Sequence, residues 1–165
     1  MPFEIKPPTG INRYGFKVRN SEDGIFHAIY FLDKLTGALL LSKEYSNVNN
    51  LKFDVDLIGG FLSALDLFIK EVKIGKNPDE IQEINFRETR ILYERMGRLL
   101  VVGITKKVDL SIERQVLRRI VVDFYNRFET SINKFNGHIE PSIMQYKKRL
   151  ENTNINNLFS QFHRF

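Results

Sequence analysis

The segment 25–33, which reads IFHAIYFLD, limits the possible folds of this chain more than any other stretch. The side chains of a strand alternate between the two faces of a sheet, and both faces of this strand would be apolar. One face would carry Phe26, Ala28, Tyr30 and Leu32, and the other His27, Ile29 and Phe31. Such a strand must be covered twice. The comparable run is 99–105, LLVVGIT, so the pair predicts the centre of a sheet with helices on both faces.

Length and composition predict one domain. A chain of 165 residues, 42% of them hydrophobic, can bury about two-thirds of its unfolded surface. We expect a single domain over 1–165, with an extended arm at 1–24, a core at 25–140, and a last helix and tail at 141–165. The chain has no cysteine, which excludes disulfides and thiolate metal sites. No apolar run reaches the ~18 residues of a membrane span, so we expect a cytoplasmic protein, with peripheral membrane contact left open.

The formal charge of +5 comes from 25 Lys and Arg against 20 Asp and Glu. The basic residues are scattered along the sequence, and the aromatic-interleaved basic stripe of a nucleic-acid binder is missing. We therefore expect no nucleic-acid partner.

Breaker residues and periodicity predict the remaining elements. They are a hairpin strand at 38–45 after a turn at Gly37, a helix from Asp54 or Asp56 to about Ile74, strands at 80–87, 90–95 and 98–105, a helix from Asp109 or Ser111 to Phe135, and a last helix from Pro141 to about Leu150. The apolar tail residues, which we expect to dock on the domain or on a partner, are Leu158, Phe159, Phe162 and Phe165.

The first expected helix has an unusually wide apolar arc at roughly 100° per residue. Its centre, expected to face the sheet, consists of Leu57, Phe61, Ala64, Leu65, Phe68 and Val72. Ile58, Leu62 and Ile69 widen the arc on a flank that the sheet need not cover. Gly59 and Gly60 each cost the helix ~1 kcal/mol relative to alanine, which indicates a close approach to another element.

No motif in the chain specifies a reaction. The Gly75-Lys76 pair lacks the other residues of a phosphate-binding P-loop, and the dinucleotide, hydrolase and zincin motifs are absent. His27 is expected in the core, while His138 and His163 lie far from it in sequence. We therefore predict no catalytic, cofactor-binding or metal-ligating residue, and no enzyme.

Four segments carry a resemblance to a known family. They are 26–42, FHAIYFLDKLTGALLLS; 54–72, DVDLIGGFLSALDLFIKEV; 98–105, RLLVVGIT; and 135–141, FNGHIEP. Over about residues 25–150 the chain resembles the longin domain of the longin/roadblock superfamily, in its archaeal form. The roadblock fold begins with a helix, for which 1–24 contains too much proline and glycine. The resemblance implies an α+β fold with a five-stranded antiparallel sheet, in the order strand, strand, helix, three strands, helix, helix.

The resemblance also implies a function. Longin and roadblock domains are non-catalytic protein-interaction modules that serve small GTPases or membrane-trafficking complexes, often as homodimers or heterodimers with a relative. We expect such an adaptor or scaffold, without a cofactor. The alternative, left open, is a ligand-sensing domain that holds a small molecule between sheet and helix.

The expected interface joins the free flank of the first helix to the strand at 80–87. The longin strand order places that strand at a sheet edge, where it could pair with a twin. The predicted interface residues are Ile58, Gly59, Gly60, Leu62, Ile69, Ile84 and Phe86. The amino-terminal arm or the last helix could instead cover the same flank within one chain.

Overall fold

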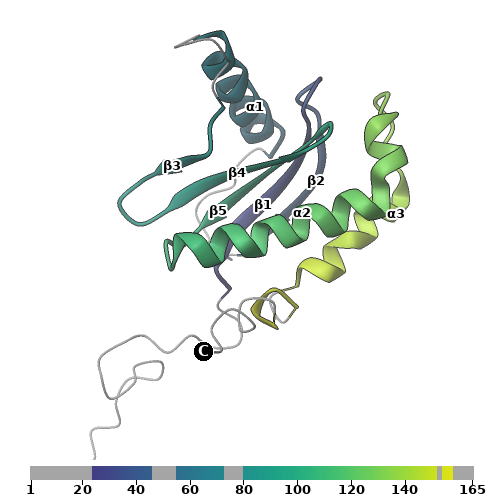
Figure 1. Ribbon diagram of the computed structural model, residues 1–165. Coiled ribbons are helices and arrows are strands. Elements are labelled where there is room, and N and C mark those ends of the chain that lie inside the picture. Colours follow the sequence, from purple (N-terminus) through teal and green to yellow (C-terminus); the bar gives the residue numbers. More distant parts are fainter. Residues whose placement is uncertain (1–23, 46–54, 73–79, 152–153, 158–165) are drawn as a thin grey trace, which may run out of the picture.

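A computed structural model describes residues 24–45, 55–72, 80–151 and 154–157 (Figure 1). The elements are β1 (Phe26–Asp33), β2 (Leu39–Glu44), α1 (Val55–Glu71), β3 (Glu83–Asn85), β4 (Arg90–Met96), β5 (Leu99–Thr105), α2 (Leu110–Asn133), α3 (Pro141–Gln145) and the 3-10 helix η1 (Tyr146–Leu150). This order is the one predicted, except that the last helix is divided into α3 and η1. Residues 1–23 of the expected arm and the apolar tail at 158–165 lie outside the described residues.

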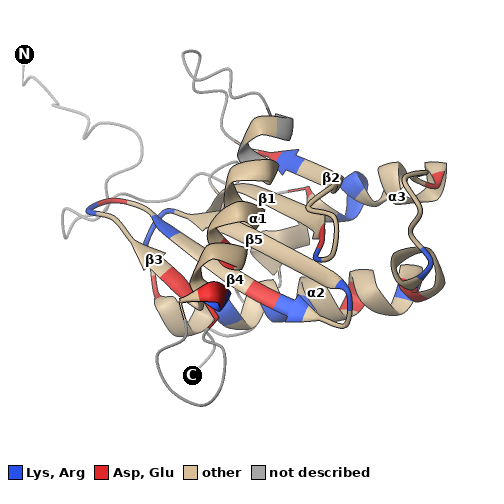
Figure 2. Ribbon diagram, turned by 90° about the horizontal axis from the view of Figure 1, so that it is seen from above, with Lys and Arg blue, Asp and Glu red and all other residues tan. Residues whose placement is uncertain are grey.

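The five strands form one antiparallel sheet in the order β2-β1-β5-β4-β3. The two strands that are apolar on both faces, β1 and β5, pair with each other inside the sheet. Helix α1 covers one face, and α2 lies across the other (Figures 1 and 2). The predicted α+β class, with helices on both faces, is confirmed. Strand β3 is shorter than the expected 80–87 and lies at a sheet edge.

The side chains of β1 divide between two cores, and the expected division is wrong for Phe26. The register with β5 shifts between Phe26 and Ala28, as at a β-bulge. Phe26 therefore packs with Ile29 and Phe31 in the core under α2, while Ala28 and Tyr30 belong to the core under α1.

The start of α2 and the turn after β1 follow the predicted chemistry, whereas α2 ends at Asn133 rather than at the expected Phe135. The Asp109 carboxylate accepts a hydrogen bond from the Ile112 backbone N–H at 3.1 Å, which caps α2 at its first turn. Gly37 has φ +74°, the left-handed conformation that glycine adopts without strain. These local signals set the start of α2 and the turn between β1 and β2.

One buried ion pair connects the sheet to α2, and another joins strand ends within the sheet. The fully buried Glu113 of α2 accepts hydrogen bonds from the Arg90 guanidinium at 2.9 Å and from the Asp109 backbone N–H at 2.7 Å. At the other end of the sheet, Arg98 Nε lies 2.5 Å from Asp33 Oδ1. Burial alone would raise the pKa of Asp33, but hydrogen bonds from Arg98 and Thr36 outweigh it and lower the pKa. Both carboxylates are fully paired, so they hold the fold together.

Candidate protein-interaction surface

The most apolar arc of α1 faces away from the sheet. The outer stripe is defined as Leu57, Phe61 and Phe68 of α1 together with Val72, the residue after it. These side chains have 72%, 62%, 63% and 41% of their surface exposed. At ~100° per residue, Phe61 and Phe68 project in nearly the same direction. The sequence prediction, which placed these residues against the sheet, is wrong.

The opposite arc of α1 packs on the sheet, although it is partly polar. Ser63 and Asp66 are buried there together with Leu62, which is 2% exposed. Asp66 forms ion pairs with Arg95 of β4 and, at 3.1 Å, with Lys70 of α1. An unpaired carboxylate would not tolerate this burial, so the pair with Arg95 is what lets the polar arc face inward.

A neighbouring tyrosine reports the same environment. Tyr93 lies on β4 beneath α1, and its hydroxyl lies 3.4 Å from the Leu62 carbonyl. Burial, and then the nearby Asp66 carboxylate, raises the pKa of Tyr93 to about 12. The hydroxyl is therefore neutral at physiological pH and can donate to that carbonyl.

The glycines of α1 have different surroundings. A Cβ on Gly59 would lie 3.1 Å from Leu32 Cδ2 of β1, so this position lets the helix approach the sheet. A Cβ on Gly60 would meet no atom within 4 Å. The prediction of a close approach is thus correct for Gly59, but the neighbour is the sheet of the same chain rather than a second helix.

The remaining predicted interface residues are distributed over three environments. Leu62 is buried and cannot lie on a free flank, which corrects that assignment. Ile69 and Ile84 are half-buried and pack against the core under α1. Phe86, just after β3, is 52% exposed. The Ile58 side chain lies outside the described part of the chain. No observation tests whether these residues form an interface.

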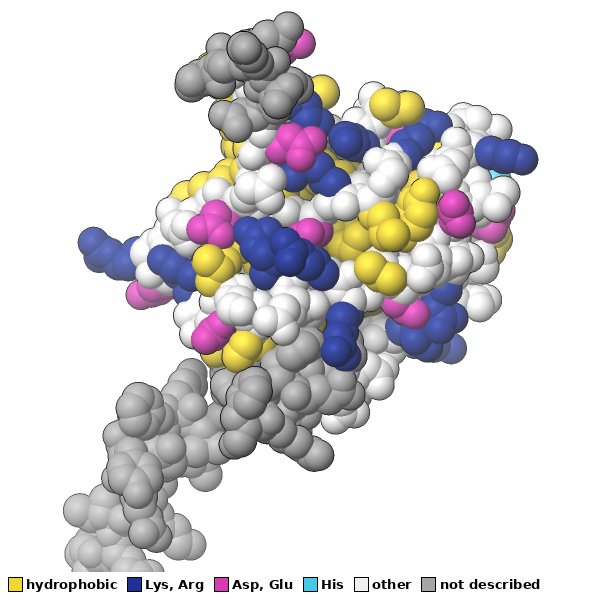
Figure 3. All heavy atoms as spheres, in the orientation of Figure 1, with side chains coloured by type: hydrophobic (Ala, Val, Ile, Leu, Met, Phe, Trp, Pro, Cys, Tyr) yellow, Lys and Arg dark blue, Asp and Glu magenta, His cyan; other side chains and the backbone are white. Residues whose placement is uncertain are grey.

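A groove separates α1 from β3. It has a volume of about 480 Å³, and its apolar lining comes from Leu65, Ile69, Ile81 and Ile84. Glu80, Gln82 and Glu83 also line it. Figure 3 shows hydrophobic side chains at the upper left, between the places that α1 and β3 occupy in Figure 1. The groove runs beside the free edge of the sheet, so an occupant could also contact that edge.

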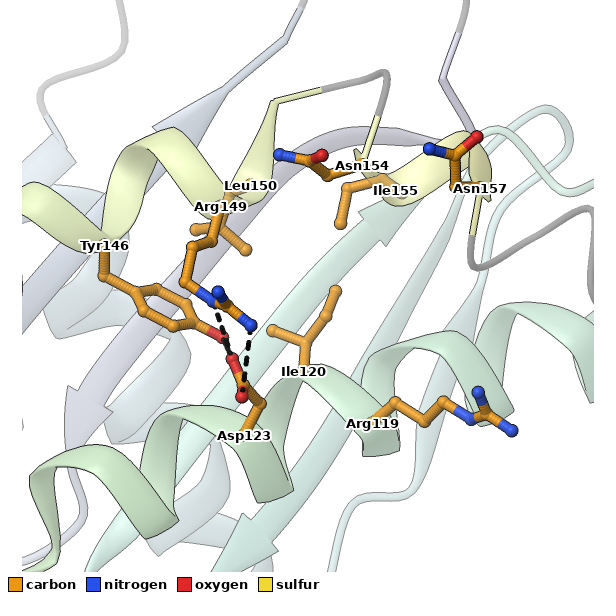
Figure 4. Close-up of a pocket in the computed structure, with 9 residues that line it drawn as sticks. All are labelled: Arg119, Ile120, Asp123, Tyr146, Arg149, Leu150, Asn154, Ile155 and Asn157. Carbon is orange, nitrogen blue, oxygen red and sulfur yellow. Dashed lines mark hydrogen bonds and ion pairs between the residues drawn. The ribbon is translucent and has the colours of Figure 1, made fainter.

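A second hollow, of about 410 Å³, lies between α2 and the carboxyl-terminal segment (Figure 4). Asp123 of α2 accepts hydrogen bonds from the Tyr146 hydroxyl at 2.7 Å and from Arg149 Nε at 3.1 Å. Burial opposes ionisation of Asp123, but these bonds and one from Arg127 lower its pKa. The Arg119 side chain points away from the hollow (Figure 4). The carboxylate is fully engaged in joining α2 to η1, so the hollow offers no reactive group.

The described residues supply no evident reaction centre. His27 is half-buried on β1, where burial and then the nearby Lys106 lower its pKa, while His138 is exposed and His163 lies outside the described residues. Within the described segments, no group of three or more His, Asp or Glu could hold a metal ion. No helix there is long and apolar enough to span a bilayer.

Sequence reasoning missed the outer stripe because it assigned the widest apolar arc to the sheet. One signal could have found it. Ser63, Asp66 and Lys70 share one side of α1. On β4, the side chains of Tyr93 and Arg95 point to the same face of the sheet, because they are two residues apart. An acidic residue on the helix, together with an arginine that points to the helix-covered face of a strand, predicts an ion pair between the two layers.

Comparison with known proteins supports the fold. No family model and no curated protein matches the sequence. Among solved structures, MglB of Myxococcus xanthus superposes with a TM-score of 0.54, over 64% of this chain and 85% of that chain, at 16% identity. The archaeal affinity expected from the sequence is not tested by this likeness. The fold is longin-like, as the sequence resemblance implied.

Proposed function

We propose that this protein is a non-catalytic interaction module, an adaptor or scaffold for a small GTPase or a trafficking-type complex, which binds its partner on the outer stripe of α1. The observation that carries the proposal is the exposure of Phe61 and Phe68, at 62% and 63%, on a helix whose other side is anchored to the sheet. The GTPase association comes from the longin and roadblock families, whose fold this chain shares.

The outer stripe has the properties of a binding surface. Contiguous exposed apolar surface is uncommon on soluble monomers and often marks a contact site. Burying a large apolar side chain contributes about 1.5–3 kcal/mol, and aromatic residues are frequent interface hot spots. The buried pair of Asp66 with Arg95 fixes the helix, so the stripe is presented without reorganisation of the backbone. A partner helix or loop with an apolar face fits this surface.

The test is capture of a partner on the immobilised full chain, in the presence of GDP or of a non-hydrolysable GTP analogue. We expect mass spectrometry to identify a small GTPase that is retained with one nucleotide and released with the other. Purified GTPase should then bind the purified chain directly. Retention of proteins without regard to nucleotide would contradict the GTPase assignment and leave a general interaction module.

Ligand sensing is the second candidate, because the groove of about 480 Å³ between α1 and β3 lies between sheet and helix. Native mass spectrometry of the purified chain distinguishes the two functions. A stoichiometric small molecule that is lost when Ile69→Arg fills the groove would favour ligand sensing. A cytoplasmic location and the absence of a nucleic-acid partner belong to the same proposal, which leaves peripheral membrane contact open.

A further inference from the structure

The outer edge of β3 is a free strand edge within the described structure. β3 pairs only with β4, through Glu83–Leu92, Ile84–Ile91 and Asn85–Arg90. The backbone of Phe86 donates to the Thr89 carbonyl at 2.9 Å, and Tyr93 donates to the Gln82 carbonyl at 3.1 Å. Residues of even number therefore point their backbone groups toward β4, so those of Glu83 and Asn85 point outward. An open edge of this kind can accept another strand.

The two sides of this edge differ in chemistry. On the α1 side, the groove has a mainly apolar lining from Leu65, Ile69, Ile81 and Ile84, with Glu80 beside them. On the α2 side, the Glu83 carboxylate lies 3.1 Å from Arg114 of α2. Residues 80–88 carry three acids, Glu80, Glu83 and Glu88, against the single base Arg87. The complementary strand would be apolar toward the groove and would carry basic rather than acidic residues, because the run 80–88 has a net negative charge.

A twin β3 does not meet this requirement. A two-fold pairing centred on Ile84 would bring two copies of the acidic run 80–88 together, and like charges at such a contact repel each other. The acidic bias of the edge thus disfavours the self-pairing expected from sequence.

One segment of the chain itself has the required pattern. Residues 13–19 read RYGFKVR, in which Tyr14, Phe16 and Val18 alternate with Arg13, Gly15, Lys17 and Arg19. As a strand, the segment would present three apolar side chains to one face and three basic ones to the other, with no acid. It lies outside the described residues, and its sequence complements the apolar groove and the net negative charge of the run 80–88.

Chain length favours a second copy as the source of this segment. The Ile25 carbonyl accepts a hydrogen bond from the Lys106 N–H at 3.0 Å, so the chain is already fixed beside β5 at that point. A strand outside β3 would lie four strand spacings from β1, which is ~19 Å. The six steps from Ile25 back to Arg19 reach at most ~20–22 Å. Phe26, Thr105, Arg90 and Asn85 lie side by side across the four strands from β1 to β3. A link from Ile25 to a strand outside β3 would therefore cross this end of the sheet.

The β3–β4 turn at 86–89 and the start of the loop after β5 occupy that end of the sheet. A link within one chain has almost no slack to pass around them. We propose that residues 13–19 of a second copy add to the edge of β3, with Tyr14, Phe16 and Val18 in the groove beside α1. Two chains exchange their arms reciprocally in this arrangement, which closes both edges. The outer stripe of α1 takes no part, so this inference does not depend on the proposed function.

The absence of native cysteine permits a clean cross-linking test. Lys17→Cys in one tagged full-length chain is mixed with Asn85→Cys in a chain with another tag, and a short bismaleimide is added. We expect a Lys17→Cys to Asn85→Cys product that joins the two tags. The matched control is Glu44→Cys, exposed on β2 at the opposite edge, which should give only background.

Two other cross-linking outcomes would overturn the exchange. Linkage of Asn85→Cys to itself, without the mixed product, would indicate paired β3 strands. An intramolecular cross-link, seen at the mass of a monomer in the Lys17→Cys/Asn85→Cys double variant, would show that residues 13–19 pair with β3 of the same chain.

Sedimentation gives a second readout that does not depend on register. The wild-type chain should sediment at twice 19.4 kDa at micromolar concentration, and a variant lacking residues 1–20 should sediment as a monomer with an unchanged circular dichroism spectrum. A monomeric wild type, or a folded truncated variant that stays dimeric, would refute the proposal.

Discussion

Leu62→Ala and Phe61→Ala, two neighbouring truncations on α1, should have very different effects on stability. Leu62 is 2% exposed and packs in the core under α1, whereas Phe61 is 62% exposed. Truncating a buried leucine costs roughly 2–5 kcal/mol because it removes buried surface and leaves a cavity. With a little over a third of its surface covered, Phe61 contributes at most about 1 kcal/mol of burial.

The assay is urea unfolding at 25 °C, followed by circular dichroism, with thermal unfolding as a check. The Leu62→Ala variant should lose about 3 kcal/mol, which corresponds to a fall in Tm of roughly 6–12 °C for a chain of this size. The Phe61→Ala variant should stay within about 1 kcal/mol of wild type, with the same urea dependence. If Phe61→Ala cost as much as Leu62→Ala, α1 would be turned the other way and the outer stripe would not exist.

Three further predictions concern the rest of the fold. Gly60→Ala should raise the free energy of unfolding in urea by up to ~1 kcal/mol. Gly59→Ala should raise it less, because only the Cβ added at Gly59 lies 3.1 Å from another side chain. Equal increases for the two variants would refute the close approach of Gly59 to the sheet. Arg90→Met should cost about 3–5 kcal/mol by leaving Glu113 buried and unpaired, and a second change, Glu113→Gln, should restore part of the loss. The pKa of Asp33 is lowered in the folded state, so its ionised carboxylate stabilises the fold fully at pH values above the ordinary pKa of about 3.9. This contribution is lost as the pH falls through the lowered pKa of the folded state. Asp33→Asn should therefore destabilise the chain at pH 7 more than at pH 3, and an equal loss at both pH values would contradict this.

The fold was largely predictable because its signals are local and redundant. The runs at 25–33 and 99–105 have no polar face, so they had to lie inside a covered sheet, and β1 and β5 do. Asp109 and Gly37 marked a helix start and a turn by their own chemistry. The placement of Phe26 was missed because a one-residue bulge changes the face of a strand without leaving a periodic signal.

The candidate site was only partly predictable, because its orientation depends on a long-range pair. Helix α1 was correctly expected to have a surplus apolar surface beside an edge strand. Its hydrophobic periodicity alone would turn Phe61 and Phe68 inward. In the structure the other arc packs on the sheet instead, through the buried Leu62 and through the ion pair of Asp66 with Arg95, which lies 29 residues away in the sequence. A wheel calculation contains no information about charges on another element.

The central claim is that a partner binds the outer stripe of α1, and one pair of charge substitutions tests it most directly. Phe61→Glu lies in the stripe, and Val122→Glu is an equivalent change at a 45% exposed position on α2, on the other face of the sheet. Both variants should remain folded, because neither side chain is buried. The account predicts that Phe61→Glu abolishes nucleotide-dependent retention of the GTPase, while Val122→Glu binds like the wild type. Undiminished binding by a folded Phe61→Glu variant would contradict the account.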